Sequence, residues 1–178
     1  MKHILVTGGA GYIGSHTTLL LLEAGYEVLV LDNFSNSSRE SLRRVEALTG
    51  RSVTLIEGDI RDAALLDRLF AEYPVNAVIH FAGLKAVGES VAQPLRYYDC
   101  NVSGSLCLLE AMDRAGVKTL VFSSSATVYG DPASVPIRED FPLSATNPYG
   151  ATKLHIEDML RDLHRSDESW NLAILRYF

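Results

Sequence analysis

Tyr149 and Lys153 are the residues of this chain whose types and spacing best suit acid–base chemistry. Side chains four apart on a helix lie on one face, so the lysine ammonium is expected near the phenol. A neighbouring positive charge stabilises a phenolate and lowers the tyrosine pKa from its usual value of about 10. The pair therefore indicates a tyrosine base assisted by a lysine, although a functionless surface pair has the same spacing.

A hydroxyl partner for this tyrosine is expected where the apolar run that starts at Thr119 ends in three serines, Ser123 to Ser125. In an open α/β sheet, ligands bind outside the carboxyl ends of the strands. A serine at the end of a strand is therefore well placed to bond a catalytic phenol.

A second candidate site is the glycine-rich segment from Thr7 to Gly14, which follows a short apolar run and precedes a helical pattern. Its glycines fit both G-x-G-x-x-G and G-x-x-G-x-x-G. Glycine lets the backbone turn sharply, and the free N–H groups of a helix start attract a diphosphate. Asp32 ends the next apolar run, where a carboxylate can accept hydrogen bonds from an adenosine ribose. A plain strand-to-helix turn with a capping aspartate is the alternative.

The bulk composition limits the classes of function. The chain has 178 residues, enough for one domain, and a net charge of −6, which argues against nucleic acid or an anionic membrane as partner. Cys100 and Cys107 lie two helical turns apart and predict free thiols. The five histidines lack metal-ligand spacing, so no metal is expected. No apolar run reaches 18 residues, and a cytoplasmic protein is the expectation.

The elements that position these groups alternate between strands and helices, which predicts an α/β fold with a doubly wound parallel sheet in strand order 3-2-1-4-5-6. The predicted strands are His3–Thr7, Glu27–Asp32, Ser52–Asp59, Ala77–Ala82, Thr119–Ser125 and Leu172–Tyr177. The predicted helices are Tyr12–Ala24, Arg39–Leu48, Ala63–Glu72, Leu95–Ala115 and Tyr149–Arg165. The loop from Ala126 to Pro148 is long for a compact fold, which favours a functional role.

Taken together, the motifs resemble those of the extended short-chain dehydrogenase/reductases, and within that family the 4-epimerases of UDP-hexoses. The resemblance covers essentially the whole chain. It is carried by the segments TGGAGYIGSH (7–16), LDN (31–33), EGDIRD (57–62), HFAGLKAVGES (80–90), SSSATVYG (123–130), NPYGATK (147–153) and LRYF (175–178).

The resemblance implies a Rossmann-type domain over residues 1–178 that binds NAD. It implies catalytic roles for Ser125 as hydroxyl, Tyr149 as base, and Lys153, which would also hold the nicotinamide ribose. The implied cofactor contacts are Gly8, Gly11, Tyr12, Ile13, Gly14, Asp32, Asn33, Phe34, Ser35, Asn36, Ser37, Asp59, Ile60, Phe81, Ala82, Gly83, Leu84, Lys85, Asn101, Tyr149, Lys153 and Phe178. The carboxylate of Asp32 would repel the 2′-phosphate of NADP, which favours NAD.

The implied reaction is a reversible oxidation at C4 of a UDP-hexose such as UDP-galactose or UDP-glucose, followed by reduction from the opposite face. Family 4,6-dehydratases carry an extra acid and base after the catalytic hydroxyl, where this chain has Ala126 and Thr127, so a dehydratase is not expected. Two alternatives stay open. One is an NAD-binding fragment without turnover, and the other is a family member that acts on another nucleotide sugar.

Two further expectations follow from the resemblance. A homodimer would form through helices Leu95–Ala115 and Tyr149–Arg165. The chain also ends at the predicted sixth strand, so the family's C-terminal region, which supplies most uridine and sugar contacts, is expected to be absent from these 178 residues.

Overall fold

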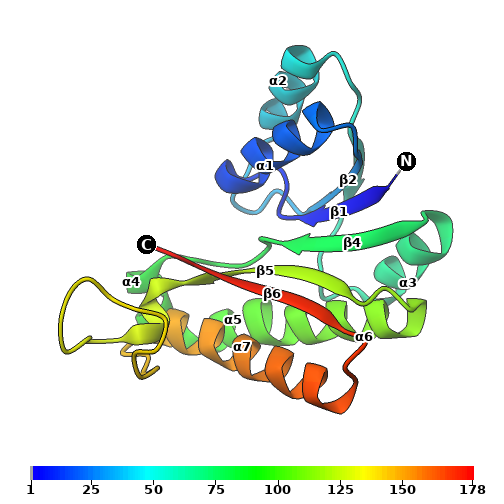
Figure 1. Cartoon of the computed structure of the whole chain (residues 1–178). Coiled ribbons are helices and arrows are strands. Elements are labelled where there is room, and N and C mark those ends of the chain that lie inside the picture. The colour runs from blue at the N-terminus through cyan, green and yellow to red at the C-terminus, as the bar shows by residue number, and fades with distance from the viewer. Residues whose placement is uncertain (1) are drawn as a thin grey trace.

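The computed structural model describes residues 2–178. Its centre is a parallel sheet of six strands in the order β3-β2-β1-β4-β5-β6 (Figure 1). The strands are β1 (His3–Thr7), β2 (Glu27–Asp32), β3 (Thr54–Glu57), β4 (Val75–His80), β5 (Thr119–Ser125) and β6 (Asn171–Tyr177). The predicted fold class and strand order are therefore confirmed.

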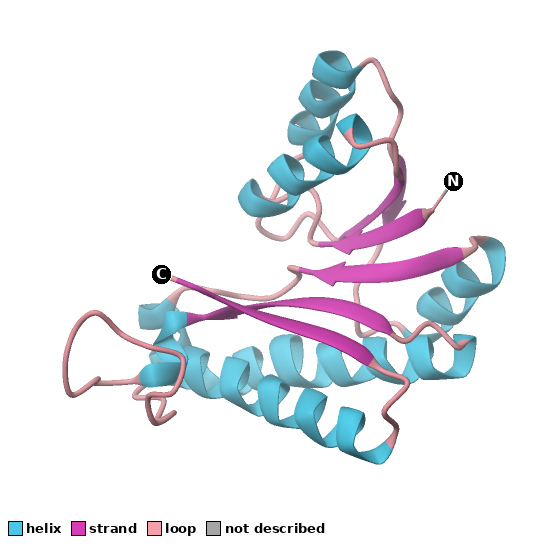
Figure 2. Ribbon diagram, in the orientation of Figure 1, coloured by secondary structure: helices cyan, strands magenta, loops and turns pink. Residues whose placement is uncertain are grey.

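Helices cover the two faces of this sheet, as Figures 1 and 2 show. Two of them, α1 (Tyr12–Glu23) and α2 (Arg39–Thr49), lie on one side, and α3 (Ala63–Glu72), α6 (Gly104–Ala115) and α7 (Pro148–Ser166) lie on the other. The remaining helical segments are α4 (Val87–Ala92), α5 (Pro94–Tyr97), the π-helical η1 (Tyr98–Ser103) and the 3₁₀ turn η2 (Ala126–Tyr129).

The apolar strands are buried because both faces of the sheet are covered, as a parallel sheet requires. Leu5 of β1 and Leu29 of β2 belong to the larger core, which α3, α6 and α7 complete. Val6 and Val30 alternate with them and face a smaller core beneath α1 and α2. The alternation along β1 and β2 thus divides each strand between two hydrophobic layers.

Local chemistry sets the helix ends. The Asp62 carboxylate caps α3 by accepting a hydrogen bond of 2.9 Å from the Leu65 N–H. Gly50 and Gly116 end α2 and α6 in the left-handed conformation, which costs glycine little. The strands β1, β2 and β5 and the helix α3 begin and end at the predicted residues.

Three segments differ most from the prediction, and β4 begins and ends two residues before its predicted span. The long helix expected over Leu95–Ala115 is made of α5, η1 and α6, and its π-helical middle carries the extra residue that turns Asn101 inward. The short helix α4 was not predicted, because six residues give too little periodicity. The strand β3 is shorter than the predicted span from 52 to 59, since only residues 54–57 pair with β2.

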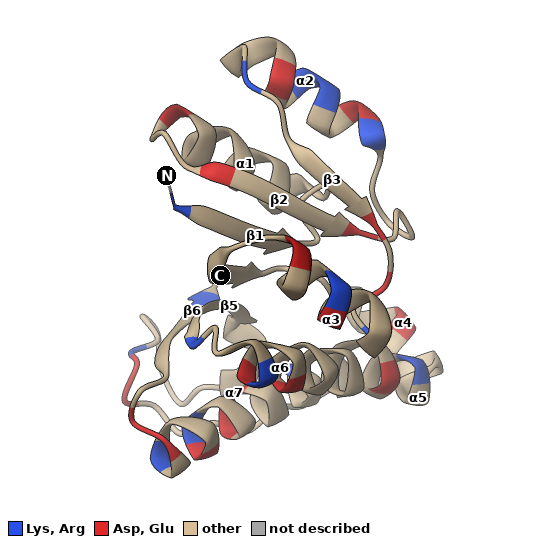
Figure 3. Cartoon of the chain, turned by 90° about the vertical axis from the view of Figure 1, so that its right-hand side faces the viewer, with Lys and Arg blue, Asp and Glu red and all other residues tan. Residues whose placement is uncertain are grey.

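Charged side chains lie mainly on the helices and loops, and acidic and basic residues alternate along α2 and α7 (Figure 3). Within residues 2–178, no helix is long and apolar enough to cross a membrane. The same residues contain no cluster of histidine, cysteine, aspartate and glutamate side chains suited to a metal ion. Both cysteines are free thiols.

Candidate active site

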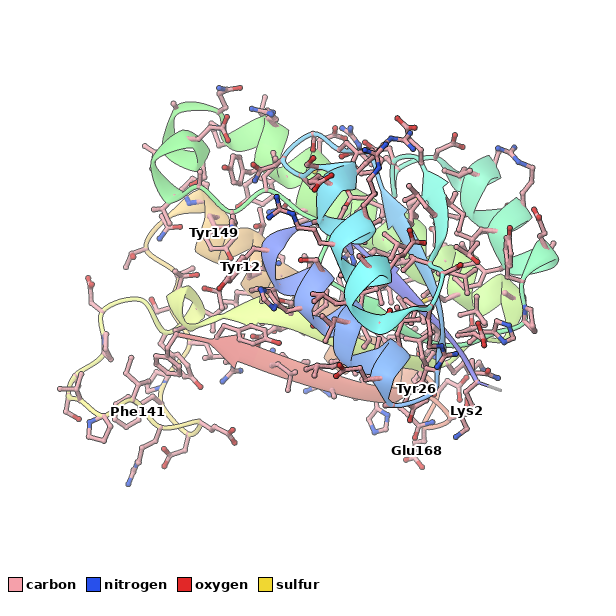
Figure 4. All side chains as sticks on the ribbon, turned by 90° about the horizontal axis from the view of Figure 1, so that it is seen from above. Lys2, Tyr12, Tyr26, Phe141, Tyr149 and Glu168 are labelled. Carbon is pink, nitrogen blue, oxygen red and sulfur yellow. The ribbon has the colours of Figure 1, made fainter. Side chains whose placement is uncertain are left out.

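A cleft runs along the carboxyl ends of the strands, where the sequence predicted a ligand site. The residues that line it, given in chain order, are Gly8, Gly11, Tyr12, Ile13, Gly14, Leu31, Asp32, Asn33, Ser35, Asn36, Ser37, Gly58, Asp59, Ile60, Phe81, Ala82, Gly83, Leu84, Lys85, Cys100, Ser123, Ser124, Ser125, Tyr149, Lys153 and Tyr177. Tyr12 of α1 and Tyr149 of α7 both line it, and they point to the same region in Figure 4. The glycine turn and the Tyr149–Lys153 pair thus belong to one site.

The glycine turn brings the start of α1 close to the ends of β1 and β4. Gly8 has a φ of 69°, and its N–H donates to the Leu31 carbonyl at 2.8 Å. A Cβ at Gly14 would lie 2.3 Å from the Gly8 carbonyl oxygen, so only glycine allows this approach of helix and turn. The first bond into the helix runs from the Ser15 N–H to Gly11, which leaves the N–H groups of residues 12–14 free for an anion.

Asp32 is buried at the end of β2 and organises the loop that follows it. One carboxylate oxygen accepts hydrogen bonds from the Phe34 N–H at 2.9 Å and the Ser37 hydroxyl at 2.7 Å. The other accepts from the Ala10 N–H at 3.0 Å. A carboxylate has about four acceptor positions, so Asp32 can still accept from a ribose hydroxyl.

The end of the cleft that lies beside β2 and β3 is formed by the loop after β3. Asn33 donates to the Asp59 carboxylate at 2.9 Å, and Arg61 binds the same carboxylate at 2.7 Å. The side-chain hydrogen bond from Arg61 is the main reason that the pKa of Asp59 lies well below its usual value, so this carboxylate is ionised. These contacts fix the segment that carries the predicted cofactor contacts Asp59 and Ile60.

Tyr149, Ser125 and Lys153 meet at the other end, beside β5. The Tyr149 phenol and the Ser125 side chain both line the cleft, and the serine side chain lies close enough to the phenol to lower its pKa. The Lys153 ammonium donates to the Ser123 carbonyl at 2.9 Å and lies 4.9 Å from the centre of the Phe122 ring. The sequence prediction that these three groups converge at the end of β5 agrees with this geometry.

The predicted effect of Lys153 on Tyr149 is wrong for this arrangement. The Lys153 nitrogen lies 6.0 Å from the centre of the Tyr149 ring and is bound to a carbonyl instead. Burial raises the pKa of Tyr149, and the nearby Ser125 side chain opposes that rise only in part. Burial lowers the pKa of Lys153 to about 8, because the ammonium lies in a largely apolar surrounding.

Three residues predicted as cofactor contacts do not line the cleft. Asn101 is buried behind it, where its side chain binds both backbone groups of Leu84 at 2.7 and 2.9 Å and the Thr152 hydroxyl at 3.1 Å. Phe34 packs against the smaller core, and Phe178 is 85% exposed. Asn101 therefore shapes the cleft indirectly, by holding the segment from Gly83 to Lys85.

The sequence reasoning missed several lining residues. Leu31, Gly58 and Tyr177 line the cleft without having been predicted, as do Ser123 and Ser124. Tyr177 could have been found, because it ends β6 beside Ser125 of β5 in the parallel register. Gly58 lines the cleft with its backbone, and its residue type alone does not reveal that position.

A chain of buried hydrogen bonds connects the start of the glycine turn to the interior of the protein. His80 of β4 contacts the Thr7 hydroxyl at 2.6 Å and the Ser105 hydroxyl at 2.9 Å. Because the Ser105 hydroxyl donates to the Asn101 carbonyl, His80 donates through Nε2 and accepts from Thr7 through Nδ1. Burial lowers the pKa of His80 to about 3, so the ring is neutral. This histidine connects the glycine turn to the π-helical segment.

Known proteins share both the sequence and the geometry of this chain. The family model described as the NAD dependent epimerase/dehydratase family matches residues 4–178. UDP-glucose 4-epimerase of Bacillus subtilis is 63% identical over 175 residues, which cover 98% of this chain and 52% of that protein. The mouse (Mus musculus) UDP-glucose 4-epimerase is 60% identical over 185 residues, covering 100% of this chain and 53% of the relative.

Solved structures agree with this relationship. The Bifidobacterium longum UDP-glucose 4-epimerase, crystallised with NAD⁺ and UDP, matches with a TM-score of 0.98 and 54% identity over 99% of this chain and 53% of its own. The chain spans about half the length of the curated relatives it matches. With a family model that spans nearly all of its residues, this chain belongs to the NAD-dependent epimerase/dehydratase family and is a homologue of the UDP-glucose 4-epimerases.

Proposed function

We propose that this chain is the cofactor-binding and proton-transfer part of a UDP-hexose 4-epimerase. The observation that carries the proposal is that one cleft contains three sites. They are the glycine turn that suits a diphosphate, the Asp32 carboxylate that can accept from a ribose, and the Ser125–Tyr149–Lys153 group. The relatives named above, whose names give the same activity, support it over nearly the whole chain.

The cleft fits NAD at each position that the structure defines. The free N–H groups at the start of α1 suit a pyrophosphate, and the close contact at Gly14 keeps that helix start against the turn. Asp32 suits the adenosine ribose, and its negative charge disfavours a 2′-phosphate. The loop from Asn33 to Ser37 and the residues Asp59 and Ile60 would enclose the adenosine, while Phe81 to Lys85 would border the middle of the cofactor.

The proton chemistry belongs to the end of the cleft beside β5. When bound, NAD supplies the acceptor for the hydride of the sugar C4 and the donor of that hydride in the return step. Tyr149, as phenolate, would take the proton of the 4-hydroxyl and later return it to the same oxygen, so neither proton nor electron pair is lost. The Ser125 hydroxyl would bond the phenol, and the Lys153 ammonium, which lines the same cleft, would bind the nicotinamide ribose.

The residues weigh against a dehydratase. Elimination would require an additional acid and base next to Ser125, and the adjacent Ala126 and Thr127 cannot act as such. An enzyme that acts on another nucleotide sugar, and an NAD-binding module without turnover, are the remaining alternatives.

A homodimer is part of the proposal. Large apolar side chains lie exposed on the segments predicted to pair with a second copy: Leu95 of α5 is 82% exposed and Leu106 of α6 is 46% exposed. Exposed apolar surface of this kind favours association. Sedimentation should show a dimer, and Leu95→Glu should shift the protein to monomer, whereas a wild-type protein that sediments only as monomer would contradict the pairing.

The bound nucleotide tests the proposal and separates it from the alternatives. The purified protein is denatured, and NAD, NADH and NADP are quantified per chain. NAD at close to one per chain is expected, and a protein that neither contains nor binds NAD would contradict the cofactor assignment. With UDP-galactose added, UDP-glucose should form without net NADH. Stoichiometric accumulation of NADH would favour another oxidoreductase, and bound NAD without turnover would favour the inactive module.

A further inference from the structure

Three successive residues of β5 each lie against a residue of α7, and the three partners on α7 are one helical turn apart. The Ser125 side chain lies near the Tyr149 phenol and lowers its pKa, the Ser123 carbonyl accepts from Lys153 at 2.9 Å, and the Ser124 hydroxyl donates to Glu157 at 2.6 Å. Positions 149, 153 and 157 share one face of the helix. The first two contacts belong to the proton-transfer group, but the third has no part in the chemistry proposed so far.

Glu157 is a carboxylate with no solvent exposure and a full set of donors. Besides Ser124, it accepts two hydrogen bonds from Arg176 at 3.0 and 2.7 Å and one from Arg161 at 2.5 Å. Burial alone would raise its pKa, but the hydrogen bonds from Arg176 and Ser124 outweigh burial and lower it. Glu157 is therefore an ionised, fully paired anion below the active site.

Arg176 extends the connection to two further elements of the cleft. It lies on β6 directly before Tyr177, which lines the cleft, and it donates to the Tyr129 hydroxyl on η2 at 2.6 Å. Its guanidinium also lies 4.9 Å from the centre of the Tyr129 ring. Through Glu157 and Arg176, the ends of β5 and β6, the turn η2 and the helix α7 are all joined at one point.

The geometry points to Glu157 as a positioning residue of the active site. We infer that its contacts with Ser124 and Arg176 set the position of α7 along β5, and with it the contact between Ser125 and Tyr149. A buried ion pair is seldom needed for stability, since apolar residues of similar size are often as stabilising. A directional, fully satisfied carboxylate instead fixes one alignment of helix and strand. This role in catalysis rests on the function proposed above, whereas the role in alignment does not.

Two variants and a matched control test the inference. Ser124→Ala removes one hydrogen bond and leaves Glu157 paired with both arginines, so the fold is expected to persist. Glu157→Gln removes the charge and is expected also to lower the melting temperature. Asp162→Asn removes an exposed partner of Arg165 on the same helix and serves as the control, with kinetics equal to wild type.

The measured quantities are kcat and KM for UDP-galactose and the pKa of Tyr149. That pKa is read from ¹³C-labelled tyrosine by NMR, with Tyr149→Phe identifying the signal. We expect kcat to fall about tenfold in Ser124→Ala and about 100-fold in Glu157→Gln, with KM little changed, as for a small misplacement of catalytic groups. The pKa of Tyr149 should rise in both, because a Ser125 side chain held less closely to the phenol stabilises the phenolate less.

Measuring the pKa of Tyr149 by NMR keeps this test independent of the proposed function. If the wild-type protein turns over no UDP-hexose, the proposed function fails, while a shifted Tyr149 pKa in Ser124→Ala still supports the alignment role. The inference is overturned if both variants lose only thermal stability and keep the wild-type kcat and Tyr149 pKa. Glu157 would then stabilise the fold without positioning the active site.

Discussion

The Ser90 hydroxyl accepts a hydrogen bond of 3.1 Å from the Tyr149 N–H, although 59 residues separate the two in sequence. Ser90 is fully buried on α4 and donates in turn to the Val87 carbonyl at 2.6 Å. The segment Gly83–Lys85, which lines the cleft, leads into this helix. The wall of the cofactor cleft is thus tied directly to the first turn of the helix that carries the proposed base.

Replacing Ser90 by alanine should affect both stability and turnover. The Tyr149 N–H loses its acceptor, which should cost about 1 kcal/mol of unfolding free energy. Because the same bond positions Tyr149, kcat should fall about tenfold with KM nearly unchanged. Urea unfolding and steady-state kinetics measure the two effects. Ser166→Ala, which removes a hydroxyl from the exposed end of the same helix, should change neither.

Two glycines on helices should respond in opposite ways to alanine. A Cβ at Gly14 meets backbone atoms at 2.3 and 2.7 Å, so Gly14→Ala must displace the turn, and NAD binding should be lost. A Cβ at Gly88 of α4 meets no atom within 4 Å, and Gly88→Ala should add about 0.5–1 kcal/mol of stability. Calorimetric NAD binding and thermal melts test both, and wild-type NAD affinity in Gly14→Ala would contradict the cradle.

Asp32→Asn should weaken NAD binding and relax the preference against NADP. Asparagine keeps one acceptor oxygen but loses the charge and the second acceptor, which binds the Ala10 N–H. We expect at least about a tenfold loss of NAD affinity and a smaller loss, or a gain, for NADP. Titration of both nucleotides by calorimetry decides this. An unchanged ratio of the two affinities would show that Asp32 does not select the cofactor.

His80 should make stability depend on pH below neutrality. Its pKa is about 3 in the folded protein and about 6.5 in the unfolded chain, so the unfolded state binds the additional proton between these values. The contribution of His80 to the free energy of unfolding is therefore fully present above pH 6.5. It is lost as the pH decreases, by about 2 kcal/mol from pH 6.5 to 5. Urea unfolding of wild type and His80→Gln should show a smaller slope in the variant, and equal slopes would contradict a buried neutral ring.

The sequence predicted best those features that follow from local chemistry. The run Ile4–Val6 and the glycine turn each depend on residue type and spacing over a few positions, and the structure has them where they were predicted. The same holds for the convergence of Ser125, Tyr149 and Lys153, because strand order alone brings the end of β5 beside the start of α7.

Features that depend on long-range contacts could not be predicted. The bond from Tyr149 to Ser90, the hydrogen bonds that hold Asn101 behind the cleft, and the pairing of Glu157 with Arg176 all join different elements of the fold. The orientation of Lys153 towards Ser123 also depends on tertiary packing, which is why its expected effect on Tyr149 was wrong. Residue spacing shows which groups share a face, but not which partner each one takes.

The conversion of UDP-galactose carrying deuterium at C4 tests the central claim most directly. The purified protein with its bound nucleotide is incubated with this substrate, and the products are examined by NMR and mass spectrometry, with Tyr149→Phe in parallel. The account predicts UDP-glucose that keeps deuterium at C4, no net NADH, and a Tyr149→Phe variant slowed by on the order of 100-fold or more. The absence of UDP-glucose from a protein that holds NAD, or a Tyr149→Phe variant as fast as wild type, would contradict it.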